Sequence, residues 1–177
     1  EVWEIKDPVR KIEYLMEQQI RKVLFEDLMS LVKYKKPENI LRFLVYLLGH
    51  PGIEINITKT ANDIGVTKTL IEENLPRLII TDLILRIKKF AHQPLRVRQG
   101  NIKCYPVDLA LRNAVFKTWD DPSADPVAMG LYAENMVAVE LSKWSEAIEV
   151  SYFRKRDKEV DFIVAYGGNN YLPFEVK

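Results

Sequence analysis

The first half of the chain carries apolar residues at helical spacing. Asp7 followed by Pro8 is typical of a helix start, with the aspartate as N-cap and the proline at the first helical position. The apolar positions that follow predict one amphipathic helix: Val9, Ile12, Leu15, Met16, Ile20, Val23 and Leu24. The pattern continues over 25–34, and another helix is predicted over 37–48, where Gly49 is a typical C-terminal stop.

The middle of the chain has the pattern of a helix-turn-helix. Thr58 is a candidate cap for a short helix over 57–64, and Gly65 provides a tight turn into a longer helix over 67–83. Pro76 lies inside this longer segment, so we expect either a kink or a later helix start. The helices are followed by apolar runs that predict two strands, as in the wing of a winged helix, over 83–90 and 96–105.

Helices and strands alternate in the remaining chain. Two helices and one strand are predicted in the order 109–116, 127–144 and 148–153. The C-terminal residues contain two short apolar runs, 160–166 and 171–176, which flank a Gly-Gly-Asn-Asn sequence. Glycine and asparagine tolerate positive φ, so these runs predict a β-hairpin.

The predicted hairpin brings charged side chains onto neighbouring strands. Because strand side chains alternate in direction, Asp161 lies on one face of its strand, and Glu175 and Lys177 share a face of the next. Two carboxylates on adjacent strands suit a Mg²⁺ ion, and a neighbouring lysine can orient an attacking water or stabilise a phosphoryl oxygen. The alternative is a solvent-facing pair of Glu175 and Lys177 with Asp161 as a strand-edge charge, and the motif alone leaves both open.

Taken with Glu134 on the preceding predicted helix, these residues resemble the PD-(D/E)xK, or restriction-endonuclease-like, superfamily. The chain is more closely similar to the C-terminal region of archaeal and bacterial AAA+ ATPases, in which a winged helix precedes a nuclease-like domain. The segment 103–114 extends the resemblance upstream. The resemblance implies that Asp161, Glu175 and Glu134 ligate Mg²⁺, the last directly or through water, and that Lys177 positions the water nucleophile, so that these four residues are catalytic.

The sequence departs from the family pattern in two ways. It contains no G-x-x-x-x-G-K-[ST] phosphate-binding loop, so we expect ATP to bind only in a missing ATPase domain of the same chain. It also stops at Lys177, before the helix and strand that usually complete the nuclease-like fold, so that domain is expected to be incomplete.

Charge is balanced overall but not locally. The chain has 26 Lys and Arg against 25 Asp and Glu, so net charge indicates no partner. Between residues 83 and 107 there is no acidic residue, and the six basic ones are Arg86, Lys88, Lys89, Arg96, Arg98 and Lys103. We expect them to contact DNA phosphates, with Thr67, Lys68 and Thr69 near base edges. The alternative is that the basic wing docks an acidic protein surface.

A second basic group lies in the predicted turn before Asp161, at Arg154, Lys155 and Arg156. Near a metal centre this turn would grip a nucleic-acid backbone, and as a plain hairpin turn it would be solvated; both interpretations stay open.

Composition limits the disulfides, the membrane segments and the cellular compartment that we expect for the chain. The single cysteine, Cys104, excludes internal disulfides, and no apolar run approaches the ~20 residues that cross a bilayer. The charged start has no signal peptide and begins with Glu1, so we expect a cytoplasmic fragment of a longer protein with no membrane partner. Nothing in the sequence indicates an oligomeric state.

Together these features predict an α+β chain of two domains: a helical and winged-helix domain over 1–105, and an α/β nuclease-like domain with a mixed sheet over 106–177. The expected function is DNA binding with a Mg²⁺-dependent phosphodiesterase site in an AAA+ ATPase. The alternative is a catalytically inactive module that binds DNA or a protein partner for that ATPase.

Overall fold

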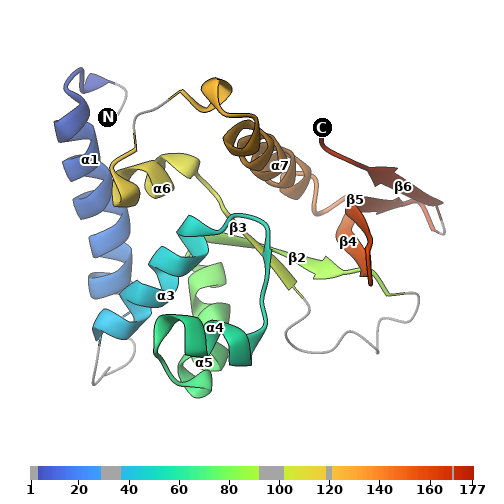
Figure 1. The fold of residues 1–177 in the computed structure, drawn as a ribbon, viewed down its shortest axis with the longest axis horizontal. Helices are drawn as coiled ribbons and strands as arrows, with labels where there is room; N and C mark the ends of the chain where they lie inside the picture. The colour runs from blue at the N-terminus through green and yellow to red at the C-terminus, as the bar shows by residue number, and fades with distance from the viewer. Residues whose placement is uncertain (1–3, 29–36, 92–101, 119–120, 169) are drawn as a thin grey trace.

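The computed structural model of the chain describes residues 4–28, 37–91, 102–118, 121–168 and 170–177. In this part the fold is α+β, with six α-helices and one six-stranded mixed sheet (Figure 1). The described helices are all too short or too polar to cross a membrane. The predicted α+β class with a mixed sheet is confirmed.

The N-terminal helix begins where the Asp-Pro pair predicts. Asp7 has extended backbone angles, and its side chain accepts a hydrogen bond from the Val9 amide at 2.9 Å. Helix α1 spans Pro8–Leu15 and runs directly into a π-helical segment, η2, over Met16–Leu28. The end of the predicted helix over 25–34 lies outside the described residues.

Three helices then surround one end of the sheet: α3 over Pro37–Gly49, α4 over Ile57–Ile64 and α5 over Lys68–Ile80. Gly65 adopts a left-handed φ of 69° and ends α4 as predicted. The predicted cap Thr58 is wrong: Asn56 caps α4, because it is the residue with extended angles and its side-chain oxygen accepts from the Lys59 amide at 3.0 Å.

Helix α5 begins early and continues past its proline. Thr67 is its N-cap and accepts from the Leu70 amide at 3.2 Å, so the later start that Pro76 suggested does not occur. The helix ends at Ile80 rather than at residue 83, and Asp82 follows with a φ of 56°. The turn therefore comes three residues earlier than the apolar pattern indicates.

The sheet has the strand order β1-β3-β2-β4-β5-β6. Its strands are β1 Ile53–Glu54, β2 Ile84–Lys89, β3 Ile102–Pro106, β4 Glu149–Lys155, β5 Lys158–Tyr166 and β6 Asn170–Phe174. All neighbours are antiparallel except β2 and β4, which run parallel. Strands from both sides of residue 105 thus share one sheet, and the division into two domains stays a prediction. Of the predicted strand over 96–105, only its last residues are described.

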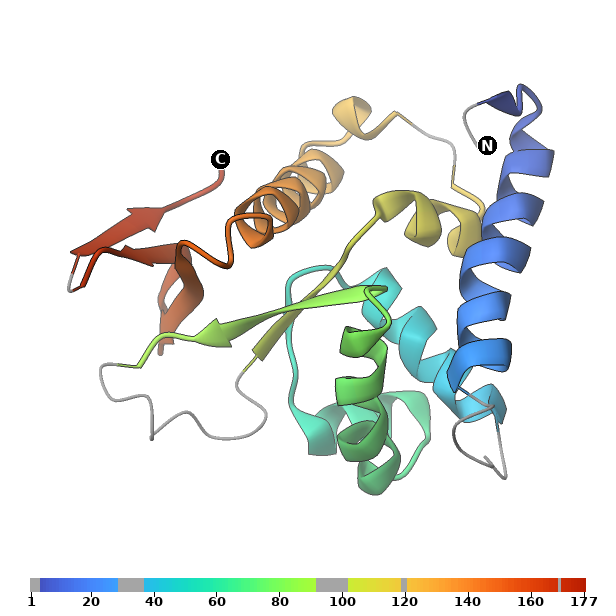
Figure 2. The same cartoon turned by 180° about the vertical axis from the view of Figure 1, so that it is seen from behind.

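The two faces of the sheet have separate cores. Cys104 and Ile84 face the helices α3, α4 and α5, which Figure 2 shows gathered around β2 and β3. Tyr105, next to Cys104 in β3, faces the opposite way, where it packs with Ala138 and Phe162. Ala138 belongs to α7, Pro126–Ser142, so this helix covers the second face. Between β3 and α7 lies the short helix α6, which has the predicted bounds, Leu109–Phe116.

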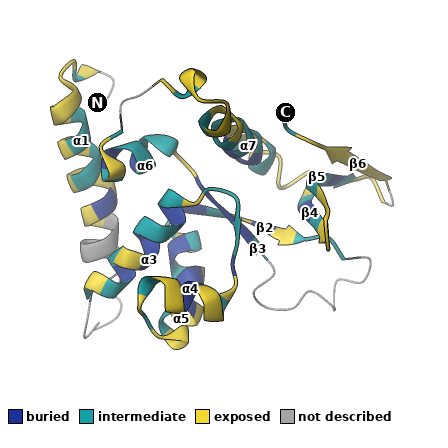
Figure 3. Ribbon diagram, in the orientation of Figure 1, coloured by how far each residue is buried: buried dark blue, intermediate teal, exposed yellow. Residues whose placement is uncertain are grey.

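The C-terminal hairpin forms, but its second strand is shorter than predicted. Gly167 and Gly168 turn the chain with φ of 54° and 92°. Strand β6 ends at Phe174 instead of residue 176, because the Val176 amide donates to the Asp161 side chain at 3.0 Å instead of joining the ladder. All five residues of β6 are exposed at the edge of the sheet (Figure 3).

Candidate functional site

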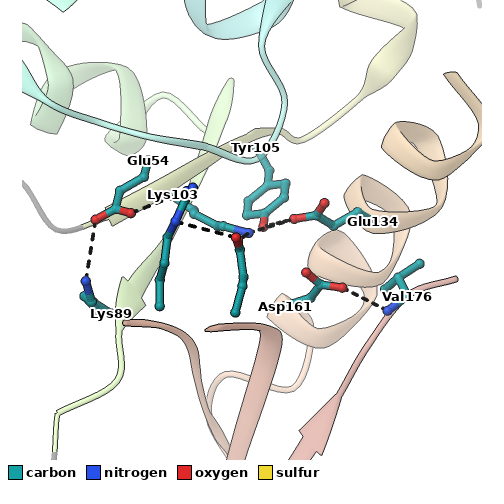
Figure 4. A network of polar contacts seen from close by, with 9 residues as sticks. Glu54, Lys89, Lys103, Tyr105, Glu134, Asp161 and Val176 are labelled. Atoms are coloured by element: carbon teal, nitrogen blue, oxygen red, sulfur yellow. Dashed lines mark hydrogen bonds and ion pairs between the residues drawn. The ribbon is translucent and has the colours of Figure 1, made fainter. Parts of the chain in front are cut away.

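A buried polar network joins strand β3 to helix α7. Alternation in β3 turns Lys103 and Tyr105 to the same face, toward Glu134 of α7. Oxygen Oε1 of Glu134 lies 2.7 Å from the Tyr105 hydroxyl, which donates to it, and 3.1 Å from Lys103 Nζ (Figure 4). The Lys103 side chain is only 4% exposed, so its charge is almost fully removed from water.

A second carboxylate reaches the same ammonium from strand β5. Glu159 Oε1 lies 2.7 Å from Lys103 Nζ, and Glu159 Oε2 lies 3.6 Å from Arg154 Nε on the neighbouring strand β4. Lys103 therefore bridges a helix and a strand that are distant in sequence. A buried ammonium placed between two carboxylates is held by paired charges, which offset part of its desolvation cost.

Asp161 is close to this network. It is two residues after Glu159 in β5, at an irregularity where two β5 residues lie opposite the single residue Tyr152 of β4, so regular alternation does not apply there. Figure 4 shows the Asp161 and Glu134 carboxylates in the same region beside the Tyr105 ring. Burial, followed by the charges of Glu134, Asp161 and Glu159, raises the pKa of the Tyr105 hydroxyl. The phenol therefore stays protonated as a hydrogen-bond donor.

The pairing also shifts the pKa of the ion partners. Burial by itself would lower the pKa of Lys103, but the hydrogen bonds that its ammonium donates to Glu159 and Glu134, together with the negative charges of these two carboxylates, raise it overall. Burial would raise the pKa of Glu159, and the hydrogen bond and charge of Lys103, with the charge of Arg154, lower it overall. Both shifts favour the charged forms, so the pair is ionised near neutral pH.

The loop between α3 and β1 packs its backbone against this network. Gly52 lies between α3 and β1 with a φ of 77°, and its amide donates to the Cys104 carbonyl at 2.8 Å. A Cβ atom at Gly52 would lie 3.1 Å from Glu134 Oε1 and 3.2 Å from a Tyr105 ring carbon. Glycine is needed here both for its backbone angle and for the close approach to Glu134.

The structure brings together only part of the predicted catalytic set. Glu134 and Asp161 both raise the pKa of the Tyr105 hydroxyl through their charges. The side chains of Glu175 and Lys177, in contrast, are 53% and 86% exposed and contact one another at 3.7 Å. Extending the β5–β6 register beyond the Phe162–Phe174 pair would put Glu175 opposite Asp161, but β6 ends first. The lysine placed beside the acids is Lys103.

A divalent ion does not fit the acids as they are arranged. Within the described ranges, no three His, Cys, Asp or Glu side chains are placed to hold a metal ion. Glu134 Oε1 is already shared by an ammonium and a phenol, and Asp161 Oδ2 accepts from a backbone amide.

The predicted nucleic-acid contacts divide into four groups. Those that are exposed are Thr67, Lys68, Thr69, Arg86, Lys88, Arg154, Lys155 and Arg156. Lys89 is half-buried and lies 3.9 Å from Glu54, which also lies 3.9 Å from Arg154. The prediction for Lys103 is wrong, because its ammonium is buried between two carboxylates and cannot reach a phosphate. Arg96 and Arg98 lie outside the described residues.

Three residues of this network were not predicted from the sequence as site residues: Tyr105, Glu159 and Gly52. For Glu159 the signal was its position two residues before Asp161, but strand alternation does not link the two, because the pairing with β4 is irregular there. For Tyr105 and Gly52 the sequence has no such signal, since their roles depend on α7 packing against β3.

Comparison with known proteins gives two family matches, both without an assigned function. The model of a family described as Domain of unknown function (DUF4143) matches residues 129–177. No curated protein and no solved structure matches the chain. The model of the family described as Domain of unknown function (DUF8612) matches residues 1–121, more than half of the chain, which therefore belongs to that family.

Proposed function

We propose that this chain is a DNA-binding module, in which a winged helix contacts the phosphate backbone. The observation that carries the proposal is the order of elements, α3-β1-α4-α5-β2-β3, with the sheet order β1-β3-β2. This order supports a winged helix, in which α5 would take the position of the recognition helix. The exposed residues at the start of α5 are polar or basic, as backbone contacts require: Thr67, Lys68 and Thr69.

Exposed cations on the neighbouring strand extend the proposed interface. Arg86 and Lys88 alternate with the buried Ile87 in β2, so both side chains project from the same face of the sheet. They share that face with Cys104, the side on which the helices pack. Lysine and arginine on such a surface supply affinity that depends on salt and not on base sequence.

A salt titration tests this function. The variant Lys68→Glu, Arg86→Glu, Lys88→Glu is compared with the unchanged chain on one DNA duplex, by fluorescence anisotropy at several salt concentrations. We expect weaker binding and a smaller dependence of log K on log salt, by roughly 0.9 for each phosphate that the protein no longer neutralises. The control is Lys22→Glu, which reverses an exposed lysine on η2. Equal slopes for the triple variant and the control would refute the proposal.

A second candidate function is phosphodiester hydrolysis by the acids. It is favoured by the positions of Glu134 on α7 and Asp161 on β5, whose charges both raise the pKa of the Tyr105 hydroxyl. The resemblance to PD-(D/E)xK nucleases implies Mg²⁺ as the metal. A cleavage assay with Mg²⁺ or Mn²⁺ should lose its product in Asp161→Asn but not in Asp157→Asn, an exposed residue of the β4–β5 turn. Equal activity in the two variants would exclude the acids as the cause.

A further inference from the structure

The Lys103 ammonium lies between Glu134 and Glu159 as a bound cation would. Its Nζ lies 3.1 Å from Glu134 Oε1 and 2.7 Å from Glu159 Oε1, with the side chain 4% exposed. One buried positive centre thus contacts oxygens from two carboxylates, whose side chains are 27% and 35% exposed. A bound cation would be held in the same way, except that it would contact the oxygens at shorter distances.

We propose that Lys103 is a built-in counter-ion that closes the space between Glu134 and Glu159 to divalent cations. The ammonium occupies the space between Glu134 and Glu159, and a metal ion would have to displace it against two ion pairs. The proposal is independent of DNA binding by the winged helix, and it opposes the second candidate function, because that function needs a divalent ion beside these acids.

The charges around Lys103 also indicate that its ammonium keeps divalent cations out. A second cation, Arg154, contacts Glu159 at 3.6 Å, but its own side chain is 48% exposed. Removal of the Lys103 charge would leave carboxylates from α7 and β5 without their buried partner. Hard divalent cations prefer carboxylate oxygens, so the vacated space would suit Mn²⁺ or Mg²⁺.

The surrounding elements of the fold also hold the Lys103 side chain in place. Lys103 extends from β3, in the centre of the β1-β3-β2 part of the sheet, and its neighbour Tyr105 donates to the same Glu134 oxygen. Gly52 packs against that carboxylate from the other side. Each group is fixed by an element of the fold, so the ammonium and the carboxylates are held at contact distance.

The test is Mn²⁺ binding by the complete chain and by its Lys103→Met variant, measured by titration calorimetry and by thermal melting with and without Mn²⁺. We expect no saturable site in the unchanged chain. Lys103→Met should bind one Mn²⁺ at least about tenfold more tightly, because a repelling charge has been removed. Its melting temperature should rise with Mn²⁺ concentration, as expected for a ligand that binds the folded state.

Two further variants make the outcome specific. Lys103→Arg retains a cation and should remain closed to Mn²⁺, whereas adding Glu159→Gln to Lys103→Met should abolish the gained site. The proposal is overturned if Lys103→Met folds and binds no Mn²⁺, or if the unchanged chain binds Mn²⁺ equally well. It is also overturned if Lys103→Met is unfolded at every Mn²⁺ concentration, because the ion should substitute for the missing ammonium.

Discussion

Replacing Glu159 by glutamine removes one of the two charges that hold Lys103. The change is nearly isosteric, and it leaves the Glu134 contact at 3.1 Å in place. Glutamine can still accept a hydrogen bond from the ammonium, so the variant isolates the charge of Glu159 from its shape. We therefore expect a folded protein with a measurable loss of stability.

The size of the loss follows from burial. Hydrogen bonds to charged groups contribute about 1.5–3 kcal/mol. Lys103 is almost fully buried, but the Glu159 side chain is 35% exposed, and solvent screening reduces its contribution. We expect Glu159→Gln to lower the free energy of unfolding by about 1 kcal/mol at pH 7.

The loss of unfolding free energy in Glu159→Gln should become smaller as the pH falls. Lys103 and Arg154 hold the pKa of Glu159 below its ordinary value of 4.5, despite the opposing effect of burial. A lowered pKa in the folded state gives stability that is present above pH 4.5 and disappears as the pH falls through the lowered pKa. The free energies of unfolding of the unchanged chain and of Glu159→Gln should therefore become more similar at acidic pH.

Urea unfolding of both proteins at pH 7 and at several values down to about pH 3.5 measures this difference. The control is Glu146→Gln, an exposed glutamate in the turn after α7, which should change stability by less than about 0.5 kcal/mol at every pH. The electrostatic account of Lys103 is refuted if the loss in Glu159→Gln is as small as in the control, or if it stays constant with pH.

Two more substitutions test the packing of the network by the same urea unfolding. Tyr105→Phe removes a donor 2.7 Å from the Glu134 carboxylate and should cost roughly 2 kcal/mol, whereas Tyr132→Phe removes a 2.6 Å hydrogen bond to a neutral amide and should cost about 1 kcal/mol. Equal losses would contradict this ranking. Gly52→Ala should cost about 1 kcal/mol more than Gly65→Ala, because both glycines have positive φ but only Gly52 has Glu134 within 3.1 Å of the new Cβ. A Gly65 variant that is equally unstable would show that the close contact does not matter.

Local signals predicted the secondary structure well where the deciding contacts are themselves local. The Asp7 cap, the Gly65 turn and the bounds of α6 each depend on residues within a few positions of one another. Thr58 was a wrong choice of cap because Asn56, two residues earlier, is the last residue with extended backbone angles. Both residue types cap helices, so composition alone does not separate them.

The site was harder to predict because its residues come from different elements, which lie side by side only in the folded sheet and its covering helix. Lys103 belongs to a segment without acidic residues, which predicts a phosphate contact. The carboxylates that bury it come from α7 and β5, and nothing local links them to β3. Lys177 follows Glu175 closely in sequence, yet it remains exposed while a lysine more than seventy positions earlier takes its predicted place beside the acids.

By itself, the sequence determined most of the helices and strands in the described part of the chain, because spacing along the chain sets which side chains point the same way. It also pointed to Asp161, whereas Glu134 followed from the resemblance to PD-(D/E)xK nucleases. Only the tertiary structure decided which faces meet. The parallel pairing of β2 with β4 and the packing of α7 on β3 bring Lys103 to Glu134 and Glu159, and these contacts depend on how distant elements pack rather than on any local pattern.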